Sequence, residues 1–276
     1  MEQEILRKVQ LIQLAMAKEV KRICTKYKIK YFLDAGTLLG AVRHKGFIPW
    51  DDDLDIGMLR SEYERFLNIA SKELDKQYFL QTWKNDDGFP YGFAKIRKKD
   101  TLYIETIDQK TKGHKEIWID IFPYDVFPDS TLEQKHQGKK IMRYRYEMMM
   151  KVGMVPWARH KNIIKKILVF IKYIPYILLG KLYSREQVIC KAEKTMQQFN
   201  KTTTSYIYPQ GGGIKYGKWI IPIRCIETLM MMPFEDDEFL VPAGYNEYLT
   251  LCYGDYMELP PPEKRGNWHQ IIEIKL

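Results

Sequence analysis

The chain has 276 residues and a formal net charge of +9 at pH 7. Its hydrophobic content of 45% is ordinary for a globular protein and argues against a disordered chain. This length allows one large domain, or a core with a smaller helical unit. The positive charge favours an anionic partner, such as a nucleotide, a nucleic acid or an anionic membrane surface.

Four cysteines are scattered along the chain, without a CxxC pair or a zinc-ligand spacing. We therefore expect reduced thiols in a cytoplasmic protein. The first residues are acidic and the segment that follows is amphipathic, so we expect no signal peptide. The cysteines are Cys24, Cys190, Cys225 and Cys252.

The N-terminal region alternates helical and extended patterns. Apolar residues recur at helical spacing over residues 4–28, which predicts a helix that packs on a sheet. A first strand is predicted at Ile29–Leu33. Ser61 and Glu64 form a capping-box pattern for a helix that continues to about Leu74. Further strands are predicted at Tyr78–Trp83, Phe89–Lys98, Thr101–Thr106 and Ile117–Phe122.

The segment Tyr31–Met58 is the most informative part of the chain. It predicts a strand, a tight turn at Gly36-Thr37, a short helix over Leu38–Arg43, a loop and a second strand. A helix N-terminus that follows a glycine presents free N–H groups to an anion. This turn is therefore a candidate phosphate-binding site.

The second strand of this segment carries Asp51, Asp52, Asp53 and Asp55. Side chains alternate along a strand, so Asp53 and Asp55 share one face, about 6–7 Å apart. Such a pair suits Mg²⁺ or Mn²⁺. The alternative is a solvated acidic turn. A phosphate site beside a metal site is what activation of a nucleotide requires.

Three basic residues are candidates for binding phosphate. The Arg43 side chain could hold a phosphate in a bidentate manner, or it could position a carboxylate such as Asp51. Lys95 and Arg97 point to one face of their strand, where they could hold donor phosphates. The alternative for these two is a solvent-facing basic edge strand.

The segment Asp34–Ile56 resembles the LicD family of phosphotransferases, which is itself similar to fukutin-type ribitol-phosphate transferases. The run is Asp34-x-Gly36-Thr37-Leu38-Leu39-Gly40-Ala41-x-Arg43-His44-x-Gly46-x-Ile48-Pro49-Trp50-Asp51-Asp52-Asp53-Leu54-Asp55-Ile56. Two later segments are similar to blocks of the same family. They are Ile119–Asp125, and Tyr253–Met257 followed by Leu259-Pro260-Pro261 and His269.

The resemblance implies an α/β fold with a nucleotidyltransferase-like mixed sheet and a helical insertion. It implies transfer of a phospho-alcohol, with phosphocholine from CDP-choline favoured, to a hydroxyl of a glycan. That acceptor would be a teichoic acid, lipopolysaccharide or capsule precursor, linked to a lipid as the family's acceptors often are. No nucleic acid partner is expected. Asp120 matches a third carboxylate that completes the metal site, and we expect it to receive the acceptor proton. His269 matches a recurring position in the C-terminal block of the family, and we expect it to contact the donor or the acceptor substrate.

Residues Leu132–Asn200 read as helices only. Within them, Lys161–Tyr183 is apolar but interrupted by lysines and a proline, and its runs are too short for a transmembrane span. This composition suits a helix in the membrane interface, which would place the protein peripherally on the cytoplasmic face. The alternative is a buried helical subdomain with lysines at its rim.

The C-terminal third reads as shorter elements. We expect a loop near the site at Gln210–Gly213, a strand at Trp219–Ile223 and a solvated acidic turn at Glu235–Glu238. A helix at Asn246–Cys252 should stop at Gly254. We expect a catalytic core at 1–130, a helical unit at 131–200, and a segment at 201–276 that completes the site.

Two other functions stay open at this point. A transferase that adds a nucleotide to a small molecule or a nucleic acid would use the same metal site. A non-catalytic scaffold would bind a nucleotide without reaction. The intact set of Asp53, Asp55 and Asp120 favours an enzyme.

Overall fold

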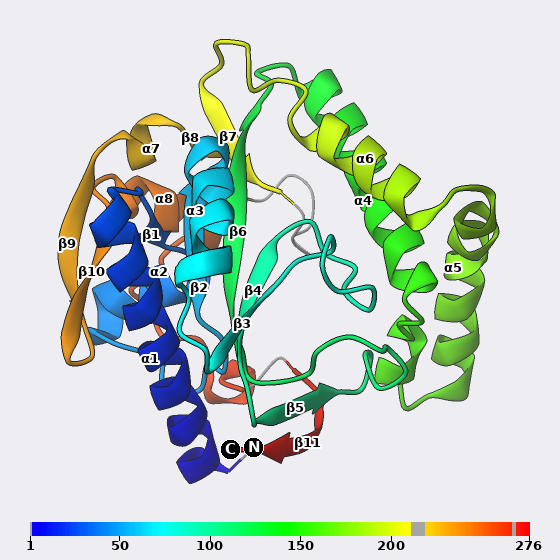
Figure 1. Cartoon of the computed structure of the whole chain (residues 1–276), viewed down its shortest axis with the longest axis horizontal. Coiled ribbons are helices and arrows are strands. Elements are labelled where there is room, and N and C mark those ends of the chain that lie inside the picture. Colours follow the sequence, from blue (N-terminus) through cyan, green and yellow to red (C-terminus); the bar gives the residue numbers. More distant parts are fainter. Residues whose placement is uncertain (1, 211–218, 267–268) are drawn as a thin grey trace.

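The computed structural model describes residues 2–210, 219–266 and 269–276 (Figure 1). Its central element is a seven-stranded sheet, built around the long strand β6. The strands are β1 (Phe32–Leu33), β2 (Asp55–Leu59), β3 (Tyr78–Gln81), β4 (Ala94–Lys98), β6 (Trp118–Phe127), β7 (Tyr206–Pro209) and β8 (Ile221–Pro222).

The strand order is β1-β2-β6-β4-β3, and β7 extends the sheet by pairing with the second half of β6 and with β8. Among the described strands of this sheet, β2 and β6 alone pair in parallel; the other pairs are antiparallel. In that parallel pair Asp55 lies opposite Asp120. The mixed sheet with its helices confirms the predicted α/β fold class.

Helices α1 (Gln3–Tyr27) and α3 (Arg60–Glu73) pack on one face of the sheet (Figure 1). The predicted N-terminal helix is therefore confirmed, because its apolar face meets the core at Val20 and Ile23. Beyond the β1–β2 edge lie α2 (Ala35–His44), α7 (Arg224–Glu227), α8 (Tyr245–Tyr253) and the hairpin of β9 (Leu229–Phe234) and β10 (Asp237–Pro242).

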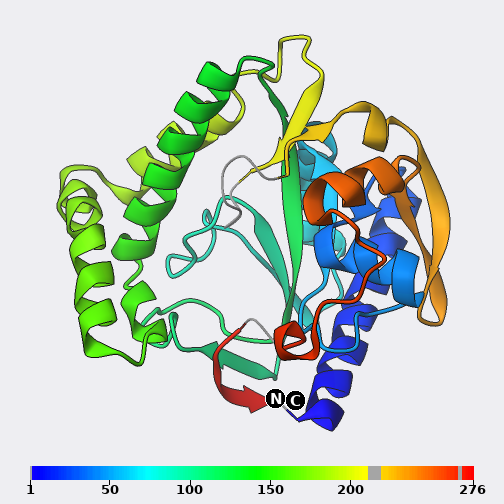
Figure 2. The ribbon, with the colours of Figure 1, turned by 180° about the vertical axis from the view of Figure 1, so that it is seen from behind.

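A helical arm, residues 131–196, stands on the opposite side of the sheet (Figure 2). It contains α4 (Thr131–Lys151), the 3-10 helix η1 (Pro156–Arg159), α5 (Ile163–Leu182) and α6 (Arg185–Met196). A second hydrophobic cluster, which includes Trp83, Phe93, Met148 and Ile189, joins this arm to the segment between β3 and β4. The predicted all-helical region is confirmed.

A small sheet pairs β5 (Leu102–Glu105) with the C-terminal β11 (Ile271–Lys275). The short 3-10 helix η2 (Pro262–Lys264) precedes it. This pairing carries the end of the chain back to the central sheet, where His269 reaches residues of the Tyr31–Met58 segment.

Several predicted boundaries are wrong. The first strand has two residues, and β3, β4 and β8 are shorter than predicted, whereas β6 continues to Phe127. Helix α3 begins at Arg60, directly after β2, so Ser61 lies inside the helix and forms no capping box. Trp219 has φ 67°, which is incompatible with a strand at that residue. Of the predicted loop at 210–213, only the buried Gln210 lies within the described residues.

A turn lies in the predicted acidic segment 235–238, between β9 and β10, but the segment is not simply solvated. Its carboxylates form ion pairs with the basic face of α1. The pairs are Arg7–Glu235, Lys18–Asp236 and Lys21–Asp237. Helix α8 ends at Gly254, as predicted, where φ is 75°.

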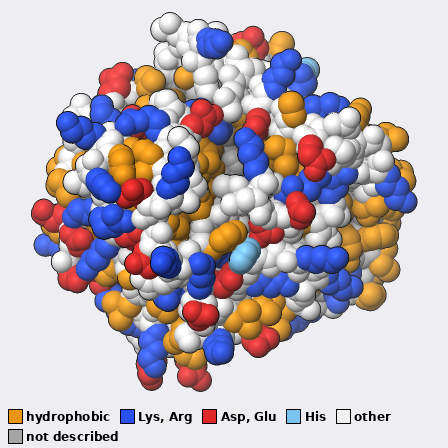
Figure 3. Space-filling view, in the orientation of Figure 1, with side chains coloured by type: hydrophobic (Ala, Val, Ile, Leu, Met, Phe, Trp, Pro, Cys, Tyr) orange, Lys and Arg blue, Asp and Glu red, His pale blue; other side chains and the backbone are white. Residues whose placement is uncertain are grey.

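Helix α5 is not a buried element, so that alternative for Lys161–Tyr183 is wrong. Only Tyr173 is buried among its residues. Its large apolar side chains face outward, as Figure 3 shows over the α5 side of the molecule. They are Ile163, Ile164, Ile167, Leu168, Phe170, Ile171, Ile174, Leu178 and Leu182, each at least 37% exposed.

Candidate active site

Two cavities meet at one group of carboxylates. The larger cavity has a volume of about 640 Å³ and includes Asp51, Asp53 and Asp55 in its lining. The smaller cavity has a volume of about 210 Å³ and includes Asp120. Phe122 lines both of them. Because Asp55 and Asp120 are register neighbours on β2 and β6, the two cavities adjoin at these side chains.

Helix α1 holds the loop that carries the aspartates. Two buried side-chain amides of α1 donate hydrogen bonds to the backbone of this loop: Gln10 Nε2 to the carbonyl of Asp51 at 2.9 Å, and Gln13 Nε2 to that of Asp52 at 2.8 Å. The carbonyls are thereby satisfied without any regular secondary structure. Neither glutamine could be identified as a site residue from the sequence, since nothing in an amphipathic helix indicates which distant backbone group a polar side chain will bind.

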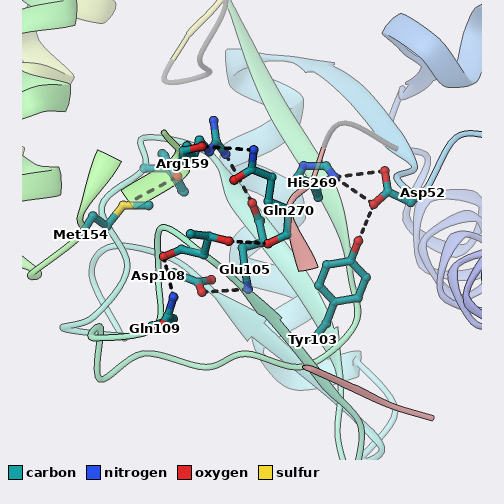
Figure 4. A network of polar contacts seen from close by, with 11 residues as sticks. Asp52, Tyr103, Glu105, Asp108, Gln109, Met154, Arg159, His269 and Gln270 are labelled. Carbon is teal, nitrogen blue, oxygen red and sulfur yellow. Dashed lines mark hydrogen bonds and ion pairs between the residues drawn. The ribbon is translucent and has the colours of Figure 1, made fainter. Parts of the chain in front are cut away.

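Asp52 faces away from the larger cavity and is a structural residue. Its carboxylate accepts a hydrogen bond from the Tyr103 hydroxyl and lies 3.1 Å from His269 Nδ1 (Figure 4). Burial alone would lower the pKa of His269, but its bond to Asp52 and the nearby carboxylates raise that pKa to about 9. The structure thus gives His269 a clear role in anchoring the loop; its predicted contact with substrate stays a prediction.

Asp53 and Asp55 lie at the base of the larger cavity. Burial, followed by repulsion from Asp53 and Asp120, raises the pKa of Asp55 well above its usual value. Burial also raises the pKa of Asp51 and of Asp53; the charge of Asp53 adds to the rise at Asp51, whereas a hydrogen bond with Asp51 opposes the rise at Asp53. No described Lys, Arg or backbone N–H group donates a hydrogen bond to Asp53 or Asp55. Carboxylates without a cationic or amide donor are ligands that suit a divalent cation.

Asp120 is placed differently from the other two predicted ligands. Its Oδ1 lies 2.7 Å from Lys95 Nζ. Among the described residues, no three Asp, Glu, His or Cys side chains converge as a complete ligand group. The residues therefore fit a cation held by Asp53 and Asp55, with substrate oxygens as further ligands, which is how Mg²⁺ usually binds. The metal itself and the ligand role of Asp120 stay predictions.

The predicted Gly36-Thr37 turn is wrong in its position. Helix α2 already begins at Ala35 and is capped by Asp34, whose side chain accepts from the Ala35 N–H at 2.8 Å. Tyr124 and Tyr248 donate to the same carboxylate. Thr37 is buried and its hydroxyl accepts the N–H of Asp55, so it positions that strand.

Gly36 lines the larger cavity against the Asp51 carboxylate. A Cβ at position 36 would lie 2.8 Å from Asp51 Oδ2. The glycine is therefore required by a close approach, and this approach places Asp51 beside the start of α2. A phosphate contact at Gly36 stays a prediction.

Arg43 lines the larger cavity but does not contact Asp51. Its Nη1 donates to the carbonyl of Tyr256 at 2.8 Å and to that of Glu258 at 3.3 Å. The alternative in which Arg43 locks Asp51 is therefore wrong. The guanidinium joins α2 to the C-terminal segment that forms one wall of the cavity, and its contact with phosphate stays a prediction.

Lys95 and Arg97 line the smaller cavity and are 7% and 5% exposed. Strand β4 lies between β6 and β3, so the solvent-facing edge-strand alternative is wrong. The structure adds two cations that the sequence analysis did not find, Arg145 of α4 and Arg159 of η1. No local pattern marked them, because the helical arm brings them to the sheet from a distant part of the chain.

Comparison with known proteins agrees with this architecture. Residues 28–163 match the family described as LicD/FKTN/FKRP, nucleotidyltransferase domain. The lipopolysaccharide cholinephosphotransferase LicD of Haemophilus influenzae is 33% identical over 279 residues, covering 96% of each chain. An uncharacterized protein of Rickettsia prowazekii is 53% identical over 103 residues, which cover 30% of this chain and 38% of that one. The human ribitol 5-phosphate transferase FKRP is 53% identical over 30 residues, 11% of this chain and 6% of its own.

The sheet, the carboxylate-lined cavities and these similarities define a phosphotransferase enzyme. The similarity to the Haemophilus protein extends over nearly the whole chain. The chain belongs to the LicD family.

Proposed function

We propose that this enzyme transfers phosphocholine from CDP-choline to a hydroxyl group of a cell-surface glycan such as a lipopolysaccharide. The observation that carries the proposal is the pair Asp53 and Asp55 at the junction of two cavities, one for each substrate. The larger cavity has room for a nucleotide, and the smaller one would receive the acceptor. The near full-length similarity to a lipopolysaccharide cholinephosphotransferase supports choline as the alcohol.

In this proposal Asp53 and Asp55 hold Mg²⁺, or Mn²⁺, beside the donor diphosphate. When bound, the ion supplies neutralisation of phosphate charge and in-line orientation of the reacting oxygens. The α2 start at Gly36, with Asp51 and Arg43, binds the donor from the sides of the larger cavity. Lys95, which Asp120 holds in place at the side of the smaller cavity, would contact the transferred phosphate.

The proposed transfer forms one bond to phosphorus, breaks another and releases one proton, for which this chain offers an acceptor. The acceptor oxygen forms a bond to the choline-bearing phosphorus, and the bond from that phosphorus to the CMP oxygen breaks. We assign the acceptor proton to Asp120, because this carboxylate lines the acceptor cavity and adjoins Asp55. Lys95 Nζ lies 2.7 Å from Asp120 Oδ1 and so holds this carboxylate in position.

The test is CMP release from CDP-choline with Mg²⁺, with and without a glycan extract of the host. Acceptor-dependent release, lost in Asp55→Asn, is expected. Release only from CDP-glycerol or CDP-ribitol would replace choline by another alcohol. Incorporation of label from CTP would instead support a nucleotide-adding transferase, and no consumption together with no Mg²⁺ binding would support a scaffold.

We further propose that the reaction takes place at a membrane, with α5 lying in the interface of an anionic leaflet. Among the described residues, no helix is long and apolar enough to cross a membrane. Helix α5 instead exposes an apolar surface with lysines along it, a combination that favours anionic lipid headgroups over a second, equally basic copy of the chain. These lysines are Lys165, Lys166, Lys172 and Lys181.

Sedimentation with lipid vesicles tests this surface. Vesicles that contain phosphatidylglycerol should bind the wild-type enzyme, and Leu168→Glu should weaken that binding. Leu132→Glu is the matched control, because Leu132 is an apolar side chain 78% exposed on α4, away from α5. Equal loss in both variants, or dimerisation through α5 without vesicle binding, would contradict the proposal.

A further inference from the structure

The smaller cavity contains more positive charge than its own carboxylates neutralise. Its lining includes Lys95, Arg97, Arg145 and Arg159. Lys95 forms an ion pair with Asp120, and Arg159 forms one with Glu105 at 3.4 Å. Figure 4 shows Arg159 and Glu105 within the polar network beside His269. Arg97 and Arg145 form no ion pair with any described residue.

Arg97 is nearly fully buried, and its hydrogen bonds go to neutral oxygens. Its Nε donates to Gln81 Oε1 at 2.7 Å and its Nη1 to the carbonyl of Glu116 at 2.6 Å. These contacts hold the guanidinium in one orientation. The Glu116 and Asp120 carboxylates are close enough to favour its charge, but no described carboxylate lies within ion-pair distance of it. Its Nη2 donates to no described residue.

Arg145 lacks more hydrogen-bond partners than Arg97 does. Its Nε and Nη1 are shielded from solvent and have no hydrogen-bond acceptor among the described residues, while the guanidinium lies 5.3 Å from the centre of the Tyr91 ring. Unsatisfied donors on a buried charged group are costly and are normally satisfied by a partner. Since the described part of the chain supplies none, a ligand is the natural partner.

The remaining carboxylate of this cavity, Asp108, lies near Arg97 but contacts neither arginine directly; burial raises its pKa, and the charge of Arg97 opposes that rise. Asp108 accepts the N–H of Glu105 at 3.0 Å and forms no ion pair with a described residue. Glu105 is engaged by Arg159. The two unpaired guanidinium groups therefore remain available to an external anion, and a guanidinium matches phosphate and carboxylate oxygens in a bidentate manner.

We propose that the smaller cavity binds an anionic group on the acceptor sugar, a phosphate monoester or a carboxylate, through Arg97 and Arg145. This inference rests on the proposed function for its assignment to the acceptor, but the anion site itself does not. It also separates Arg97 from the donor phosphates that the sequence had suggested for it. The volume of about 210 Å³ suits a small sugar with one such group rather than a nucleotide.

Direct binding tests the site independently of turnover. The full chain, in EDTA, is titrated calorimetrically with glucose 6-phosphate, glucuronate, inorganic phosphate and glucose. EDTA withholds the metal from the larger cavity, whose lining is rich in carboxylates, so saturable binding of the anions reports the smaller cavity. We expect the anions to bind and glucose not to bind.

Arg145→Gln should weaken anion binding by about 10- to 100-fold, the range for a lost hydrogen bond to a charged group. Lys140→Gln is the matched control, because Lys140 is exposed on the same helix. Should Arg145→Gln fail to fold, Arg145→Lys keeps the charge and loses the bidentate geometry, so it should still weaken binding. Absence of anion binding to the wild type, or equal binding by wild type and both Arg145 variants, would overturn the site.

Steady-state kinetics then test the assignment to the acceptor. In the presence of Mg²⁺ and host glycan, Arg145→Gln should raise the KM for the acceptor and leave the KM for CDP-choline unchanged. A raised KM for CDP-choline alone would assign the anion site to the donor instead. If the enzyme does not use CDP-choline at all, the proposed function fails while the binding result in EDTA stands.

Discussion

The two cavities differ most in the charge of their walls. The larger one has six carboxylate side chains, those of Asp34, Asp51, Asp53, Asp55, Asp255 and Glu258, against the cations of Arg43 and Lys264. The smaller one has four Lys and Arg side chains against three carboxylates, those of Glu105, Asp108 and Asp120. An anionic substrate can therefore enter the larger cavity only together with a cation, whereas the smaller cavity attracts an anion by itself.

Under the proposed function, this difference would keep two anionic substrates apart. A diphosphate donor without a metal would be repelled from the larger cavity, since repulsion between like charges is strong where water is excluded. The smaller cavity is too small for the whole donor but carries fixed guanidinium groups. Specificity then follows from charge and size together, and variants of the two cavities should have separable effects.

The largest effect is expected from Asp55→Asn in the larger cavity. Transfer should fall by at least about 100-fold, since even residues that only support metal ligands cost 10- to 100-fold when changed. The free energy of unfolding without metal should rise, because burial and neighbouring carboxylates raise the pKa of Asp55 and make its charge unfavourable. CMP release and urea denaturation measure the two quantities.

Asp87→Asn is the control for this variant, because the Asp87 side chain is 96% exposed and lines neither cavity; its surface ion pair with Arg185 contributes little. It should leave both quantities unchanged. Near wild-type transfer by Asp55→Asn would remove the basis for placing the donor in the larger cavity.

The next effect concerns the boundary between the cavities, where His269 binds Asp52. The pKa of His269 is raised to about 9, so its contribution to stability is complete below about pH 6.5 and is lost as the pH rises through 9. The size of that contribution is on the order of 3 kcal/mol. The difference in unfolding free energy between wild type and His269→Gln should therefore shrink between pH 6 and pH 10.

Urea denaturation at several pH values across that range measures this difference. Other groups also titrate there, but they are common to both proteins and cancel in the comparison. A difference that stays constant from pH 6 to pH 10 would show that the Asp52–His269 contact does not depend on a charged histidine.

A smaller effect is expected from the metal. Mg²⁺ should raise the melting temperature of the wild type, with a stabilisation of about 2.7 kcal/mol at 100 times its Kd. Asp53→Asn should lose most of this increase, and Arg145→Gln should keep it, because only the first residue lies in the larger cavity. Differential scanning fluorimetry measures both. An equal increase in all three proteins would place the ion elsewhere.

The smallest effect is expected from Arg43→Gln. This change removes the hydrogen bonds to Tyr256 and Glu258 that hold the wall of the larger cavity, so the KM for CDP-choline should rise about tenfold. The KM for the acceptor should not change. Arg65→Gln, at an exposed arginine of α3, is the control. A change in the acceptor KM alone would reverse the assignment of the two cavities.

Much of the larger cavity could be predicted from the sequence, because its central pair of carboxylates, the proposed metal ligands, is local. Asp53 and Asp55 are two residues apart, and the alternation of side chains along an extended chain is enough to place them together. Helices α1, α4 and α6 were also predictable, since the periodicity of their apolar residues depends only on neighbours within a few turns. The exact start of α2 was not, because Asp34 caps it with help from Tyr124 and Tyr248.

The smaller cavity depends on contacts between distant segments, which no local pattern encodes. Lys95 and Arg97 would point to the same face of β4 whether it were an edge strand or an internal strand. They are buried because β4 lies between β6 and β3 in the sheet. Arg145 enters from the helical arm, and His269 reaches Asp52 across 217 residues of sequence.

By itself, the sequence determined the fold class, the LicD family and the carboxylate pair of this protein. The tertiary structure decided which charges are neutralised, which cations lack a partner and which apolar surface of α5 stays exposed. The physical reason is that backbone geometry sets local spacing, whereas burial and ion pairing are set by whatever distant segment packs against each residue.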